Sequence, residues 1–231
     1  MDISYEARRL KAVSEYLLFD VKKEISHIAK LASVLTKKPI ALITLLDVED
    51  QIILSSEGIE IERMPRATSF CTYAIEQDDA IIVRDATKDD RFKNLPSVTG
   101  DLNVRFYASA NLESADGYKI GTLCVYDQKP NDLSAEELSH LKMLAIQVNN
   151  ILQLKKQLNF TKQANEAMSK IAWTHAHKVR GPLTSVLGLV DLIKHEKEVF
   201  NQEYVDLLEV AVRQLDDIVK EVVNDSSILK F

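Results

Sequence analysis

The sequence has little cysteine: only Cys71 and Cys124 occur in 231 residues. Neither belongs to a Cys-x-x-Cys pair or stands at metal-ligand spacing from a histidine, so the sequence predicts no disulfide framework and no metal site. Both lie in apolar surroundings, where cysteine usually packs as a small buried hydrophobe. We therefore expect two packing residues, and a redox role for Cys71 is the alternative.

Long apolar runs and an excess of positive charge are also missing. No run approaches the roughly 18 residues that span a bilayer, and residues 1–5 do not resemble a signal peptide. We therefore expect a cytoplasmic protein without a membrane span. The 35 acidic and 29 basic side chains give a net charge of -6, which argues against a nucleic-acid partner. The length suffices for one ordinary domain and a smaller module.

Glycine and proline are scarce, with six and five residues, and their distribution is uneven. Four of each fall between Pro39 and Pro130, and only Gly181, Gly188 and Pro182 follow. Because these residues mark turns and interrupt helices, the sequence predicts a turn-rich first region and a nearly unbroken helical second region.

The first region shows helical spacing of apolar residues over 5–37 and then several strand patterns. We expect a hairpin over 39–55 with its turn at 48–50, and further strands at 80–83, 104–112 and 119–126. The last two runs are separated by Asp116-Gly117, a strong hairpin signal. This order predicts an α+β domain with helices flanking an antiparallel sheet.

The second region begins with a capping box at Ser134 and Glu137 and continues as a helix to about His195. Within 141–158 a narrow apolar stripe predicts a coiled-coil seam; it consists of Leu141, Leu144, Val148, Ile151, Leu154 and Leu158. After a break at 195–200, Asn201 and the staple pair Phe200 and Val205 predict the start of another helix. Its stripe is Tyr204, Leu208, Ala211, Leu215, Ile218 and Val222. A lone hairpin cannot bury both stripes, so we expect a homodimer in which two all-α hairpins form a four-helix bundle.

Several segments between residues 65 and 128 resemble the GAF domains of bacterial signalling proteins. They are Pro65–Ile75, Val83–Ala86, Asp90–Phe92, Val104–Ala108 and Ile120–Asp127. The resemblance spans roughly residues 5–155 and implies the GAF fold, but it does not identify a ligand. A bilin is not expected, because its attachment cysteine is commonly followed by histidine, whereas Thr72 follows Cys71 and Val125 follows Cys124.

Four polar or aromatic side chains could line a GAF ligand pocket: Tyr73, Asp85, Arg105 and Tyr107. The alternative is that the aromatic residues belong to the core and the charged residues pair with each other.

The segment Ala172–Leu183 contains a proline inside a predicted helix, which removes a backbone hydrogen bond and kinks the axis. From local physics alone, a kink with incidental histidines is an equal alternative. The segment also resembles the phosphoacceptor box of histidine kinases, the HisKA dimerisation and phosphotransfer domain, written H-E-x-R-x-P. His177, Arg180 and Pro182 fit that pattern, whereas His175 does not. The resemblance implies that His177 accepts phosphate from ATP and passes it to a response regulator receiver domain.

Two positions depart from the family pattern. Lys178 stands where the family has an acidic residue that accepts a proton, and a protonated lysine cannot do so. Gly181 stands where a threonine or asparagine commonly supports phosphatase activity. We also find no Gly-rich nucleotide-binding segment. We therefore expect ATP and Mg²⁺ to act only through an ATP-binding catalytic domain, in cis or in trans, and we expect no autophosphorylation by this chain alone.

The sequence thus predicts a GAF sensor domain over 1–155 and a HisKA-like hairpin over 156–231, acting as the signal-transducing core of a two-component sensor histidine kinase. Two alternatives stay open. One is a non-catalytic phosphotransfer or scaffold protein. The other is a ligand- or redox-sensing GAF protein with a dimerising tail.

Overall fold

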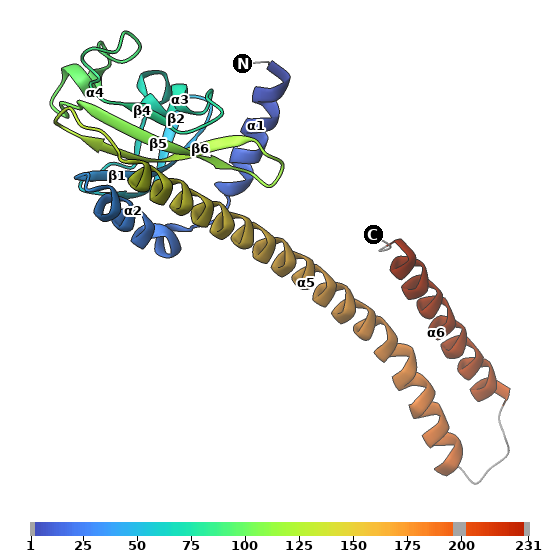
Figure 1. The fold of residues 1–231 in the computed structure, drawn as a ribbon. Coiled ribbons are helices and arrows are strands. Elements are labelled where there is room, and N and C mark those ends of the chain that lie inside the picture. Colours follow the sequence, from blue (N-terminus) through green and yellow to red (C-terminus); the bar gives the residue numbers. More distant parts are fainter. Residues whose placement is uncertain (1–2, 196–201, 229–231) are drawn as a thin grey trace. The chain divides into compact units, whose positions relative to one another are not determined.

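The computed structural model describes residues 3–195 and 202–228 (Figure 1). These residues form two compact units that divide between Asn159 and Phe160. No helix within the described ranges is long and apolar enough to cross a membrane.

The first unit is built on a six-stranded sheet in the order β3-β2-β1-β6-β5-β4, with every neighbouring pair antiparallel. Its strands are β1 (Ile40–Leu46), β2 (Asp50–Glu57), β3 (Arg63–Pro65), β4 (Ile81–Val83), β5 (Phe106–Glu113) and β6 (Lys119–Asp127). The expected antiparallel sheet and its hairpins are confirmed. The sequence did not predict β3, because three residues ending in proline are too few to show an alternating pattern.

Helices and short turns cover both faces of this sheet (Figure 1). One face carries α1 (Ile3–Tyr16), α2 (Lys22–Thr36) and the first turns of α5 (Ala135–His195). The other face carries α3 (Phe70–Ala74), α4 (Pro96–Thr99) and the neighbouring loops; the 3-10 turn η1 (Arg66–Thr68) leads into α3. Strand side chains alternate between the faces, so the unit has two apolar cores, one on each side of the sheet.

The capping box that begins α5 is confirmed. The backbone N–H of Glu137 donates to Ser134 Oγ over 3.1 Å, and the backbone N–H of Ser134 donates to Glu137 Oε2 over 2.8 Å. Two amides that lack helical partners are thereby satisfied.

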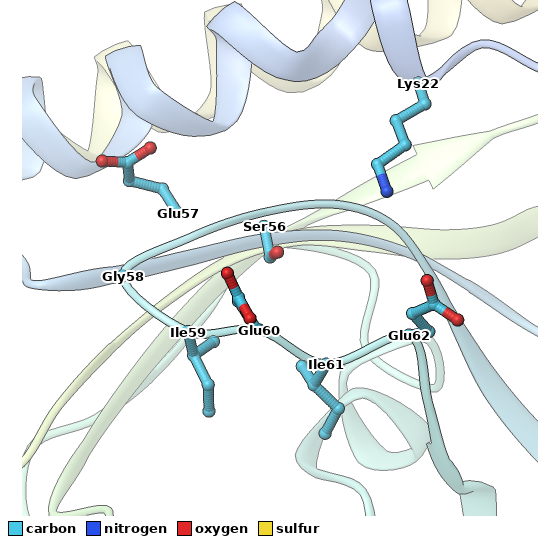
Figure 2. Close-up of a pocket in the computed structure, with 8 residues that line it drawn as sticks. All are labelled: Lys22, Ser56, Glu57, Gly58, Ile59, Glu60, Ile61 and Glu62. Atoms are coloured by element: carbon cyan, nitrogen blue, oxygen red, sulfur yellow. The ribbon is translucent and has the colours of Figure 1, made fainter.

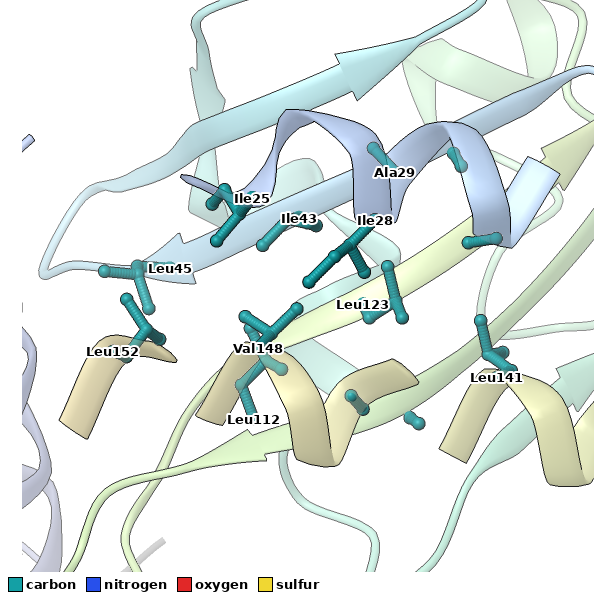
Figure 3. Packing of buried hydrophobic residues seen from close by; sticks show 14 of the residues in the cluster. Ile25, Ile28, Ala29, Ile43, Leu45, Leu112, Leu123, Leu141, Val148 and Leu152 are labelled. Carbon is teal, nitrogen blue, oxygen red and sulfur yellow. The ribbon is translucent and has the colours of Figure 1, made fainter. Parts of the chain in front are cut away.

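The first half of the predicted coiled-coil seam instead belongs to the core of the first unit. Leu141 and Val148 are fully buried and pack with Ile28 of α2 and Leu123 of β6 (Figure 3). In contrast, Leu154 is 66% exposed and Leu158 is 62% exposed. The prediction of one coiled-coil seam over 141–158 is therefore wrong for the first half of that range. Helical spacing shows that a face is buried, but it cannot show whether a sheet or a second helix covers it.

The second unit contains the remainder of α5 and α6 (Gln202–Ile228). Ala211, in the middle of the predicted α6 stripe, is buried, and Leu208, Leu215 and Ile218 are half-buried. The ion pair between Lys178 and Glu221 links the two helices. Of the predicted break at 195–200, only His195 is described, and it is the last residue of α5. The rest of the break and the predicted cap at Asn201 lie outside the described residues.

Candidate functional site

The helix carries the predicted phosphoacceptor box without interruption, because α5 continues through Pro182 to His195. Two hydroxyl groups donate to carbonyl groups one turn earlier: Thr184 Oγ1 to the carbonyl oxygen of Arg180 over 2.8 Å, and Ser185 Oγ to that of Gly181 over 3.3 Å. Both bonds follow the proline closely. Bonds of this kind accompany helix bending, so the segment combines two features that disturb regular helix geometry.

The two histidines of the box have different surroundings. His177 is exposed, and its ring lies beside that of Trp173, with 4.6 Å between centroids and 51° between ring planes. His175 is half-buried. The pKa of Glu221 on α6 lies below its ordinary value, because Lys178 donates a hydrogen bond to it and, to a smaller extent, because His175 is near. His175 is thus less accessible to solvent than His177.

The other predicted residues of the box have distinct roles in the structure. Lys178 Nζ lies 2.6 Å from Glu221 Oε1, so this lysine is held by a carboxylate of the second helix. Arg180 is exposed and Pro182 is half-buried. An exposed imidazole with two cationic side chains within one turn can receive an anionic phosphoryl group.

The tyrosines predicted to line a GAF pocket belong to the aromatic core. Tyr107 is fully buried and packs against Phe70, with ring centroids 4.8 Å apart. Tyr73 meets Phe92 edge to face, with centroids 5.1 Å apart.

The two predicted charged residues bind groups that are close to them in the sequence. Arg105 Nη1 donates to the carbonyl oxygen of Val98 over 2.9 Å. Asp85 accepts from Thr87 Oγ1 over 2.6 Å and lies 3.2 Å from the ammonium group of Lys88. Tyr107 is buried and Tyr73 packs against the core, as the alternative expects for the aromatic residues. Arg105 and Asp85 bind different partners rather than each other. Ligand binding by the four residues stays a prediction.

The sequence did not predict that the two cysteines would be neighbours. Cys71 on α3 and Cys124 on β6 are both fully buried, and their sulfur atoms are 3.8 Å apart. Three polar groups donate to Cys71 Sγ: Thr122 Oγ1 over 3.1 Å, Gln51 Nε2 over 3.3 Å and the Tyr107 hydroxyl over 3.4 Å. The hydroxyl of Tyr126 lies 3.7 Å from the same sulfur.

The two thiols differ in acidity. Burial raises the pKa of the Cys71 thiol, but hydrogen bonds from Cys124 and three hydroxyl groups outweigh burial and hold this pKa below its ordinary value. Burial, together with the hydrogen bond to Cys71, raises the pKa of Cys124 well above its ordinary value. The cluster therefore pairs a thiolate-stabilising position with a protonated thiol.

A hollow of about 870 Å³ lies along the loop from β2 to β3 (Figure 2). Three carboxylates line it, and Lys22 reaches toward it from α2; the carboxylates are Glu57, Glu60 and Glu62. Because Glu60, Glu62 and Lys22 are solvent-exposed, the hollow lacks the convergent buried polar groups of a specific ligand site. Among the described residues, no group of three or more His, Cys, Asp or Glu side chains is placed to hold a metal ion.

Comparison with known proteins supports the fold of the first unit. The family model for the GAF domain matches residues 20–152. The chain belongs to the GAF family. A crystal structure of the GAF domain from the Acinetobacter phosphoenolpyruvate-protein phosphotransferase is similar, with a TM-score of 0.50 and 17% identity, covering 66% of this chain and 94% of that one. At this identity the likeness shows the GAF fold alone.

One curated relative shares sequence with part of this GAF protein. The cyclic di-GMP phosphodiesterase PA2567 of Pseudomonas aeruginosa is 46% identical over 98 residues, which is 42% of this chain. The chain spans only 17% of that relative's length. The similarity therefore concerns one segment of a longer protein, and the phosphodiesterase activity in its name belongs to that protein.

Proposed function

We propose that this GAF protein is the signal-transducing core of a two-component sensor histidine kinase. In this proposal the GAF domain controls phosphorylation of His177 and transfer of the phosphoryl group to an aspartate of a response regulator receiver domain. The observation that carries the proposal is the exposure of His177 on α5, next to Arg180 and Pro182, while His175 is half-buried. The histidine with the family spacing is thus the accessible one.

The chemistry follows from an exposed neutral imidazole. One ring nitrogen attacks the γ-phosphorus of ATP, the bond from phosphorus to the bridging oxygen breaks, and ADP leaves with that electron pair. The other ring nitrogen then loses its proton. ATP and Mg²⁺ are supplied by an ATP-binding catalytic domain in cis or in trans. Lys178, paired with Glu221, cannot take the proton, but its charge can attract the phosphoryl group.

The proposal includes a homodimer formed by the hairpins. Leu183 and Leu187 stand one turn apart on α5, and Val212 and Val219 stand two turns apart on α6; all four are exposed. Because α5 and α6 pair lengthwise, helical spacing puts the four side chains on one flank of the hairpin, away from the ion pair of Lys178. A second hairpin is the partner that completes a four-helix bundle there.

The test is phosphoryl labelling with a trans-acting ATP-binding domain of a histidine kinase and radiolabelled ATP. We expect acid-labile, base-stable label on the wild type and on His175→Gln, and none on His177→Gln. His175→Gln is the matched control, since it changes a histidine two residues away on the same helix. Label that persists in His177→Gln and vanishes in His175→Gln would contradict the assignment.

The alternative of a non-catalytic scaffold predicts a different result in the same assay. In that case no donor labels the chain, whether the donor is ATP with the trans-acting domain or a phosphorylated receiver domain. Such a result would favour the scaffold, with α5 and α6 serving assembly alone.

A further inference from the structure

We propose that Cys71 and Cys124 form a redox-active pair in the GAF domain, which closes to an intramolecular disulfide when hydrogen peroxide reaches it. This modification site lies in the core on the α3 face of the sheet, between α3 and β6. It does not depend on His177.

The first argument is distance. The two sulfur atoms are 3.8 Å apart in the structure, and a disulfide needs about 2.05 Å. Cys71 belongs to the five-residue helix α3, and its backbone N–H is held by the side chain of Ser69. Cys124 is fixed in β6 between β1 and β5. We therefore expect the short helix, rather than the strand, to move when the sulfur atoms come together.

The second argument is the polar character of the surroundings. A cysteine that serves only for packing is surrounded by apolar groups and is inert. Cys71 Sγ instead receives donors from three strands: Gln51 on β2, Tyr107 on β5 and Thr122 on β6. Several donors converging on one buried sulfur are the arrangement that stabilises a thiolate.

The neighbouring titratable groups remain protonated and can therefore act as donors. They are Cys124, Tyr107 and Tyr126. Burial and the nearby sulfur atoms raise the pKa values of both tyrosines well above the ordinary value. The side chains at hydrogen-bond distance from the Cys71 sulfur belong to Gln51, Tyr107, Thr122, Cys124 and Tyr126, and none of the five is charged.

The reaction needs one peroxide and two thiols. The Cys71 thiolate attacks one peroxide oxygen, the O–O bond breaks, and the leaving hydroxide takes a proton to become water, which gives a sulfenic acid. The Cys124 sulfur then attacks the Cys71 sulfur, and the S–O bond breaks. The departing hydroxide takes the Cys124 proton and leaves as a second water. Two electrons pass from the two sulfur atoms to the peroxide.

A small apolar pocket lies near the cysteine pair. Its volume is about 40 Å³, and its lining includes Leu42, Phe70 and Tyr126. The Cys124 sulfur lies 3.6 Å from the carbonyl oxygen of Leu42 and 3.6 Å from the Tyr126 hydroxyl. Leu42 and Tyr126 therefore line the pocket and also contact the Cys124 sulfur. Because both thiols are fully buried, we expect a small peroxide to react with them and a bulky disulfide not to.

The test is mass spectrometry of the intact chain after reduction, removal of the reductant and exposure to hydrogen peroxide. The protein is then unfolded in guanidinium with N-ethylmaleimide. Because the chain has two cysteines, the reduced form takes two maleimides. We expect the oxidised form to take none, to be two hydrogen atoms lighter than the reduced unlabelled chain, and to yield a linked peptide pair of Cys71 and Cys124.

An internal control shows whether the peroxide treatment was sufficient to oxidise accessible sulfur. Met143 and Met168 are solvent-exposed, and methionine reacts with peroxide to give a sulfoxide. If these methionines are oxidised while both cysteines still take maleimide, the proposal is overturned. Oxidised glutathione is expected to leave both thiols free. A disulfide formed with glutathione but not with peroxide would overturn the assignment of the oxidant.

Single substitutions assign the roles. In Cys124→Ser we expect Cys71 to accumulate a sulfenic acid that dimedone captures, and in Cys71→Ser we expect no dimedone adduct on Cys124.

Thr122→Val removes one hydrogen bond to the Cys71 sulfur. It should move the midpoint of the pH profile of the oxidation rate upward by roughly one pH unit. Thr44→Val is the control, because its hydroxyl contacts Thr122 and not the sulfur; an equal shift there would contradict the role of the direct bond.

Discussion

At the scale of residues, the lysine that follows His177 is held by Glu221 rather than left free. Lys178→Glu alone would place an acid next to His177 but would set two carboxylates against each other. We therefore expect the charge-swapped pair Lys178→Glu/Glu221→Lys to accelerate labelling of His177 by about 10²-fold, the lower end of the gain from a general base. Initial rates with the trans-acting ATP-binding domain measure this change.

The single variant Glu221→Lys provides the control for the swap. It sets two ammonium groups together without adding a base, so we expect no acceleration. If the charge-swapped pair labels no faster than the wild type, the acid at position 178 does not act as a base in this protein.

Glu6 of α1 illustrates a buried ionic contact that the sequence did not indicate. It binds the fully buried Arg9 through two hydrogen bonds of 2.7 and 2.9 Å and also pairs with Arg66 over 2.7 Å. The hydrogen bond from Arg9 is the largest cause that lowers the pKa of Glu6, from its ordinary 4.5 to about 2. Because the folded value is the lower one, this carboxylate stabilises the fold above pH 4.5, and the effect is lost as pH falls toward 2.

Glu6→Gln should therefore lower the free energy of unfolding by roughly 2 kcal/mol at pH 7, between the cost of breaking a buried pair and that of breaking an exposed pair. The difference from the wild type should shrink as pH falls below 4.5. Urea unfolding of both proteins at several pH values measures it. Asp50→Asn, which breaks the more exposed pair with Arg63, should cost less than about 1 kcal/mol. A difference for Glu6→Gln that is independent of pH would contradict this account.

Residues differ in how far the sequence alone reveals them. His177 can be proposed from the sequence because Arg180 and Pro182 lie at fixed offsets on the same helix, and its role as phosphoacceptor stays a prediction. Cys71 and Cys124 are 53 positions apart, and nothing local to either indicates that α3 lies over β6 at that point. Their proximity depends on strand order and helix placement, which are properties of the whole domain.

At the scale of elements, α5 changes its partner along its length. Its early turns pack on the sheet through Leu141 and Val148, whereas Leu154 is exposed. We expect Leu141→Ala to destabilise the first unit by about 2–5 kcal/mol, since it leaves a cavity in a closed core. Leu154→Ala should change stability by less than about 0.5 kcal/mol. Chemical denaturation of both variants measures the difference, and equal costs would contradict the division of the stripe.

The elements themselves were largely predictable, because their signals are local. The capping box marked the start of α5, and alternating or continuous apolar runs marked β1, β5 and β6. Gly121 is an example of a residue whose role the sequence does not reveal. A Cβ at this position would lie 1.9 Å from the carbonyl oxygen of Thr44. The sequence contains this glycine, but only the pairing of β6 with β1 explains it.

At the scale of the whole molecule, the proposed homodimer gives a direct prediction. Sedimentation at micromolar concentration should yield twice the chain mass of 26.1 kDa. Leu215→Glu should weaken the dimer, since it places an unpaired charge in the bundle core. Leu154→Glu, at an exposed position of α5, is measured in the same way. Its effect on the dimer, compared with that of Leu215→Glu, gives the contribution of the helix that links the two units. A wild-type monomer at that concentration would rule out the bundle.

The exposed stretch of α5 has a consequence for the time scale of backbone opening. From Phe160 to Thr174 every side chain except Ala164 is exposed, so almost no apolar surface of this chain covers those turns. A helix of that length without tertiary packing is only marginally stable in water. Its amide hydrogens should therefore exchange with deuterium far faster than those between Leu141 and Leu152, which open only with the core. Exchange at 160–174 that slows as protein concentration rises would show that another chain covers these turns.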